Sequence, residues 1–111
     1  MPIQYKGVNF EHNHVREHVG VFDVSHMAQV LVKGEKAFDL IQKITTNELS
    51  KLTDGKVQYS CMLNSDGGII DDLLVYRFNI KSYMLVVNAS NTEKDINWIN
   101  SCNDMGVEVI N

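Results

Sequence analysis

The sequence has little of what marks disordered, membrane-spanning or disulfide-stapled proteins. One proline and seven glycines among 111 residues are too few for a disordered or low-complexity chain. No apolar run approaches the roughly 20 residues that cross a bilayer, and the opening MPIQYK lacks the apolar stretch of a signal peptide. The two cysteines, Cys61 and Cys102, match no metal-ligand spacing, which favours reduced thiols in a cytoplasmic protein.

An excess of basic charge is also missing. Ten Lys and Arg stand against 14 Asp and Glu, for a net charge of −4, so the chain lacks the electrostatic footprint of a nucleic-acid binder. Hydrophobic residues make up 44% of the sequence, a normal share for a globular domain. We therefore expect one domain with a modest core, and neither a nucleic-acid nor a membrane partner.

The pattern of apolar residues predicts helices mixed with strands. Near-continuous apolar character over 83–87 predicts a central strand covered on both faces. Asn91 is a predicted N-cap of the last helix. The first helix has Val8, His12, Val15 and Val19 on one face. The predicted helices cover 9–19, 35–44 and the residues from 91 onward, and the predicted strands cover 21–25, 28–33, 57–63, 69–78, 83–87 and 107–110.

Short loops connect the strands between 57 and 87, and such loops demand antiparallel pairing. The sequence therefore predicts an α+β fold, an antiparallel sheet with helices on one face. Both ends of the chain enter ordered-looking sequence at once. We expect residues 1–111 to be a partial domain, truncated at both ends and belonging to a larger protein.

Two adjacent acids, Asp71 and Asp72, interrupt an otherwise apolar strand that follows Gly67-Gly68. Neighbouring strand residues point to opposite faces, so one acid should point to the interior or a cleft. Such an acid is costly unless something hydrogen-bonds to it. It could cap a loop amide or pair with a lysine, or it could accept a hydrogen bond from a ligand N–H. Periodicity does not decide which acid faces inward.

Other polar residues fall near these acids. Tyr76 follows Asp72 by four residues on the same strand face, and Asn88 ends the next strand. Together they would suit a flat, hydrogen-bonding heterocycle, although a polar cluster at strand ends explains them equally well. His14 and His18 have the spacing of a two-His metal site but no obvious third ligand, which favours a solvated helix face.

Several segments resemble, in order, the aminomethyltransferase of the glycine cleavage system, known as T-protein. The most specific are the Phe-Asp-Val-Ser-His-Met block ending at Met27 and the Gly-Gly-x-x-Asp-Asp block ending at Asp72. The resemblance runs along essentially the whole chain. The segments that carry it are residues 1–5, 11–12, 15–16, 20–27, 46–47, 67–72 and 86–89.

This resemblance implies a function. T-proteins take the aminomethyl group on the lipoyl arm of H-protein, release ammonia and pass the one-carbon unit to tetrahydrofolate. It implies that Asp72 is the catalytic residue, held in a pterin-sized cavity near the reacting nitrogens. Met27, Tyr76, Val86 and Asn88 would line the folate pocket with it. No metal is implied, and the expected compartment is the bacterial cytoplasm.

The family fold joins two β2-α-β3-α units that exchange their first strands, and residues 21 to about 103 read as one unit. T-proteins are much longer than this chain, and the missing part includes a Glu and an Arg that bind the folate tail. We therefore expect the fragment alone to be inactive and to self-associate through uncovered apolar sheet surface. The alternatives are the folate module of a dimethylglycine or sarcosine dehydrogenase, and a non-enzymatic folate-binding protein.

Overall fold

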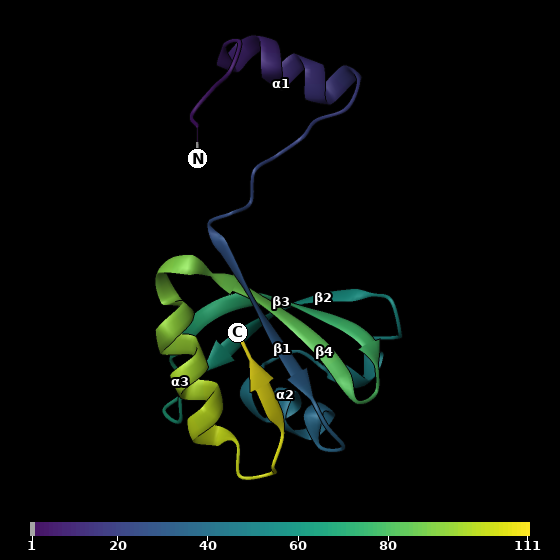
Figure 1. Ribbon diagram of the computed structural model, residues 1–111, viewed down its shortest axis with the longest axis vertical. Coiled ribbons are helices and arrows are strands. Elements are labelled where there is room, and N and C mark those ends of the chain that lie inside the picture. The colour runs from purple at the N-terminus through teal and green to yellow at the C-terminus, as the bar shows by residue number, and fades with distance from the viewer. Residues whose placement is uncertain (1) are drawn as a thin grey trace.

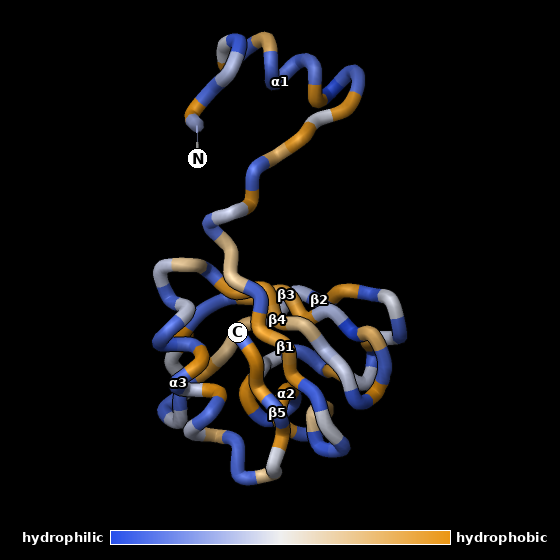
Figure 2. The backbone as a smooth tube through the Cα atoms, viewed as in Figure 1, coloured by the Kyte–Doolittle hydropathy of each residue, from blue (hydrophilic) through white to orange (hydrophobic). Residues whose placement is uncertain are grey.

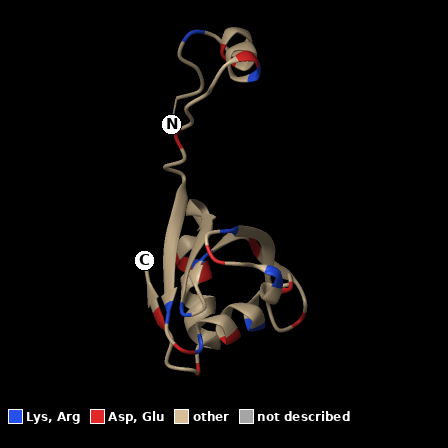
Figure 3. Ribbon diagram, turned by 90° about the vertical axis from the view of Figure 1, so that its right-hand side faces the viewer, with Lys and Arg blue, Asp and Glu red and all other residues tan. Residues whose placement is uncertain are grey.

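The computed structural model describes residues 2–111 and shows a five-stranded sheet with one helix held away from it (Figure 1). The molecule measures 50 × 27 × 24 Å, and the detached helix accounts for its elongation. None of the helices formed by residues 2–111 has the length and apolar character needed to cross a bilayer. In the view of Figure 3, acidic and basic residues are interspersed over the folded part.

The sheet has the strand order β2-β3-β4-β1-β5, and every pair of neighbours is antiparallel. This arrangement confirms the predicted α+β fold class, and it places β4 at the centre as the sequence predicts. The strands are β1 (Met27–Lys33), β2 (Val57–Leu63), β3 (Ile69–Asn79), β4 (Ser82–Asn88) and β5 (Glu108–Ile110).

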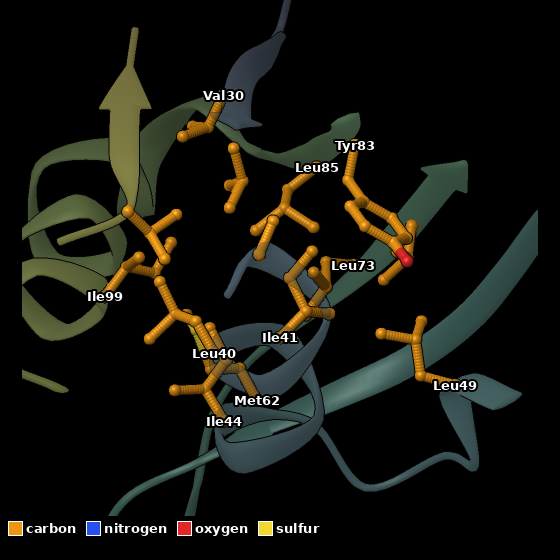
Figure 4. Packing of buried hydrophobic residues seen from close by; sticks show 14 of the residues in the cluster. Val30, Leu40, Ile41, Ile44, Leu49, Met62, Leu73, Tyr83, Leu85 and Ile99 are labelled. Atoms are coloured by element: carbon orange, nitrogen blue, oxygen red, sulfur yellow. The ribbon is translucent and has the colours of Figure 1, made fainter. Parts of the chain in front are cut away.

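One face of the sheet carries the hydrophobic core. The helices α2 (Ala37–Ile44) and α3 (Thr92–Cys102) cover this face, as predicted, and η1 (Leu49–Lys51) adds the buried Leu49 to the same core. Strand residues alternate, so every second side chain enters the core. Figure 4 shows this packing, with Leu40, Ile41 and Ile44 of α2 lying against the strands. The fully buried strand residues are Val30, Val32, Met62, Val75, Tyr83, Leu85 and Val87.

The opposite face of the sheet is open. On β4, Tyr83, Leu85 and Val87 are buried, whereas Met84 and Val86 between them are only half-buried. The expectation that β4 is covered on both faces is therefore wrong for this chain. Among residues 2–111 both packed helices lie on the core side, so nothing excludes water from the second face.

The N-terminal arm, residues 2–26, differs most from expectation. Helix α1 (Val8–Glu17) forms where predicted, but none of its residues is buried. Residues 21–24 have no regular secondary structure and Ser25 begins a turn, so the predicted strand 21–25 does not form. A strand requires a hydrogen-bonded neighbouring strand, and the sheet formed by the described residues supplies none for this segment. Figure 2 shows hydrophobic residues along this arm. Val21 and Phe22 are 96% and 70% exposed.

Candidate functional site

Strand register brings the five predicted folate-binding residues onto the open face of the sheet. Met27 is paired with Asn88, and Val86 is paired with Leu74 on one side and Gln29 on the other. Asp72 and Tyr76 flank Leu74 at intervals of two residues, so all three share this face. Residues that lie far apart in the sequence thus form one contiguous surface across β1, β4 and β3.

The acidic pair divides between the two faces. Asp71 is 6% exposed and lies on the core side, in phase with the buried Leu73 and Val75. Asp72 is exposed on the open face. The enclosed cavity expected around Asp72 is therefore wrong for this chain. Alternation gives the reason: with Leu73 and Val75 in the core, Asp71 must point inward and Asp72 outward.

Two donors hold the exposed carboxylate of Asp72. Nδ2 of Asn88 donates to its Oδ1 at 3.1 Å, and the hydroxyl of Tyr59 donates to its Oδ2 at 3.0 Å. The hydrogen bond to Asp72, followed by the negative charge of that group, raises the pKa of Tyr59. Tyr59 therefore keeps its proton and remains a donor at neutral pH.

Sequence reasoning missed Tyr59. Tyr59 is paired with Leu74, while Asp72 is paired with Cys61, so Tyr59 is a diagonal neighbour of the acid on the adjacent strand. Aromatic side chains reach such diagonal positions. The alternation of apolar and polar residues over 57–63 and the hairpin that follows were the available sequence signals. With the strand register known, they predict the contact between Tyr59 and Asp72.

The amide of Asn88 joins the two acids across the end of β4. Its Nδ2 donates to Oδ1 of Asp71 at 2.8 Å as well as to Asp72, and its backbone N–H donates to Oδ2 of Asp71 at 3.4 Å. Both hydrogens of Nδ2 are directed at carboxylates, so the side chain can offer only its Oδ1 to a ligand. Asn88 thus positions Asp72 and presents one fixed acceptor of its own.

Residues beside this polar cluster are apolar or aromatic. Met27, Val86 and Tyr76 are half-buried, and with Leu74 they form a strip on the open face. A flat ring system could lie on this strip while its polar edge meets Asp72 and Asn88. The open face therefore offers an apolar support for a ring, a carboxylate acceptor and an amide acceptor.

The other candidates do not assemble a comparable site. One hollow lies between α3 and the start of β3, and a second lies between α1 and the rest of the arm; neither is lined by Asp72. The rings of His14 and His18 lie 5.0 Å apart, yet among residues 2–111 no three His, Cys, Asp or Glu side chains are grouped as metal ligands would be. Cys61 and Cys102 are free thiols.

Comparison with known proteins gives the family. The sequence model described as the GCVT N-terminal domain matches residues 1–111, the whole chain. The chain belongs to the GCVT N-terminal domain family. Its sequence is 62% identical over 111 residues to an aminomethyltransferase of Flavobacterium psychrophilum and 55% identical over 111 residues to one of Bacteroides fragilis. Both matches cover 100% of this chain and 31% of the relative.

A solved structure of this family agrees with the fold. The crystal structure of glycine cleavage system aminomethyltransferase T from Bartonella henselae matches with a TM-score of 0.91 at 37% sequence identity. The match covers 99% of this chain and 31% of that one. The chain thus spans about a third of the length of the family members that it matches.

Proposed function

We propose that this chain is part of a tetrahydrofolate-dependent aminomethyltransferase and supplies one wall of its folate site. The protein that contains it would take an aminomethyl group from the lipoyl arm of H-protein and pass the one-carbon unit to tetrahydrofolate. The observation that carries the proposal is the meeting of Met27, Asp72, Tyr76, Val86 and Asn88 on one sheet face. The aminomethyltransferases among the relatives support the reaction class.

The chemistry assigned to Asp72 is electrostatic. In the transfer, a folate nitrogen forms a bond to the aminomethyl carbon, ammonia leaves, and the lipoyl sulfur is released as a thiol when the carbon joins the second folate nitrogen. The attacking nitrogen gains positive charge. A carboxylate already fixed by Tyr59 and Asn88 can accept its N–H and stabilise that charge without reorganising.

The remaining residues of the face would bind the ring. Met27, Val86 and Tyr76 would pack against the pterin, and Oδ1 of Asn88 would accept from its polar edge. H-protein is the expected protein partner because it carries the aminomethyl group. We place the reaction in the bacterial cytoplasm, where the free thiols of Cys61 and Cys102 would stay reduced.

The test uses the full-length parent protein and an assay in which H-protein supplies the aminomethyl group. Asp72→Asn keeps the size of the side chain but removes its charge. We expect kcat to fall by about 10²- to 10³-fold, the usual cost of removing one preorganised electrostatic contact. Asp66→Asn is the matched control, because Asp66 is an exposed acid of the β2–β3 loop. Normal turnover by Asp72→Asn would remove Asp72 from this role.

A further inference from the structure

A second carboxyl group lies directly behind the candidate site. Asp95 projects from α3 into the core, and its side chain is completely buried. Among residues 2–111 no amide or hydroxyl donor reaches either of its two oxygens. An ionised carboxylate in that position is very costly, so the group needs either a proton or another partner.

The partner of Asp95 is Asp71. The Asp71 carboxyl is the neighbouring group that acts most strongly on Asp95. Two carboxyls can share a hydrogen bond only if one of them is protonated, because a carboxylate can only accept. Asp71 already accepts from both N–H groups of Asn88 named above and, at 3.0 Å, from the backbone N–H of Asp72. These donors stabilise the ionised form of Asp71. The proton therefore resides on Asp95.

The electrostatics agree with this geometry. Burial is the main reason that the pKa of Asp95 rises to about 7, and the Asp71 carboxylate adds to it. Burial also acts on Asp71, but the hydrogen bonds from Asp95, Asn88 and Asn91 outweigh it, so the pKa of Asp71 is lowered. The charged groups that act on Asp95 are Asp71 from β3 and Lys94 from its own helix, and Lys94 opposes the rise.

We propose that Asp95 is a positioning residue: its proton is donated to the Asp71 carboxylate and fixes it in place. Asp71 then accepts from the Asn88 amide, and that amide in turn orients the carboxylate of Asp72 at the candidate site. The chain of contacts crosses the sheet from core to open face, through Nδ2 of Asn88 at 2.8 Å from Asp71 and 3.1 Å from Asp72. Loss of the proton would place two ionised carboxylates together in the core, and Asp71 would turn from its place. The proposal rests on the proposed function only for the identity of the ligand.

The test uses the full-length parent and its Asp95→Asn variant, in which a neutral amide keeps a donor for Asp71 but cannot titrate. Glu93→Gln, at an exposed acid on the same helix, is the control. Two quantities are followed from pH 6 to 8.5. One is the affinity for tetrahydrofolate by calorimetry. The other is the NMR shift of the Asn88 side-chain amide, which needs no ligand.

We expect the affinity of the wild-type protein and of Glu93→Gln to weaken by about fivefold or more as pH rises through 7, the lower end of typical couplings between sites. Asp95→Asn should keep its affinity across this range. The Asn88 amide should titrate near pH 7 in the wild type and stay constant in Asp95→Asn. Equal pH profiles for wild type and Asp95→Asn would overturn the proposal. An Asn88 amide that titrates in a parent without tetrahydrofolate affinity would support the relay and contradict the proposed function instead.

Discussion

Substitution of the buried Asp95 should change how the stability of this chain depends on pH. The folded-state pKa of Asp95 is about 7, against 3.8 for an ordinary aspartate. A raised acid pKa means that the folded state holds a proton which the unfolded state has released. Stability should therefore fall by about 1.4 kcal/mol per pH unit between pH 5 and 7, and level off above 7.

The size of this effect follows from the two pKa values. About three pKa units correspond to at most about 4 kcal/mol between the acidic and the basic limits. The lowered pKa of Asp71 acts in the opposite direction, but its contribution is complete above pH 5 and adds no slope in this window. Asp95→Asn should thus remove the slope and be the more stable protein at pH 8.

Urea unfolding of the 111-residue chain, followed by the fluorescence of its single tryptophan, Trp98, measures this dependence. Glu93→Gln serves as the control and should retain the wild-type slope, because Glu93 is exposed. If Asp95→Asn loses stability with rising pH as steeply as the wild type does, Asp95 is not the group that takes up a proton on folding.

Three further predictions concern the site, the core and the fragment. Tyr59→Phe removes one donor to Asp72 and should lower kcat of the parent by about 2- to 10-fold, the value of one hydrogen bond. The control is Tyr83→Phe, which should leave kcat unchanged because the hydroxyl of Tyr83 has no partner among residues 2–111. Leu85→Ala, at a fully buried site of the central strand, should cost about 2–5 kcal/mol in urea unfolding of the chain, and a loss below 1 kcal/mol would show that the core is looser than described. The isolated chain should bind tetrahydrofolate weakly or not at all by calorimetry, because the sheet face proposed to bind folate is open. Tight binding would show that this one wall suffices.

Sequence periodicity predicted most of the sheet because buried and exposed residues alternate along each strand and can be recognised without knowing its neighbours. The strands 57–63 and 69–78 were placed within one residue of β2 and β3, and the hairpin between them fixed their antiparallel pairing. The predicted strand 21–25 does not form because a strand needs a hydrogen-bonded neighbour, and the sheet of residues 2–111 offers none to this segment. Asn91 occupies the N-cap position of α3, as predicted, but its side chain makes no capping hydrogen bond. The hydroxyl of Thr92 instead donates to the carbonyls of Asn88 and Ala89 in the preceding turn.

The sequence predicted which residues form the candidate site better than it predicted how they are arranged. The resemblance to the family motifs pointed to Asp72 and Asn88. Because Leu73 and Val75 are buried in the core, the alternation of side chains along β3 then requires Asp72 to lie on the open face. Which acid of the pair faces the core depends on how β3 is phased against α2 and α3, and the sequence of the strand alone does not encode that phase. Tyr59 and Asp95 were missed for a related reason, since their contacts to Asp72 and Asp71 join different elements.

The proposed function requires that folate bind on the open sheet face around Asp72. A crystal structure of the full-length parent with tetrahydrofolate bound tests it most directly. We expect the pterin ring to lie on the strip formed by Met27, Val86 and Tyr76. A folate nitrogen should lie within about 3.2 Å of the Asp72 carboxylate, the outer limit of an N–H···O hydrogen bond. A folate bound elsewhere, with Asp72 still in contact only with Tyr59 and Asn88, would contradict it.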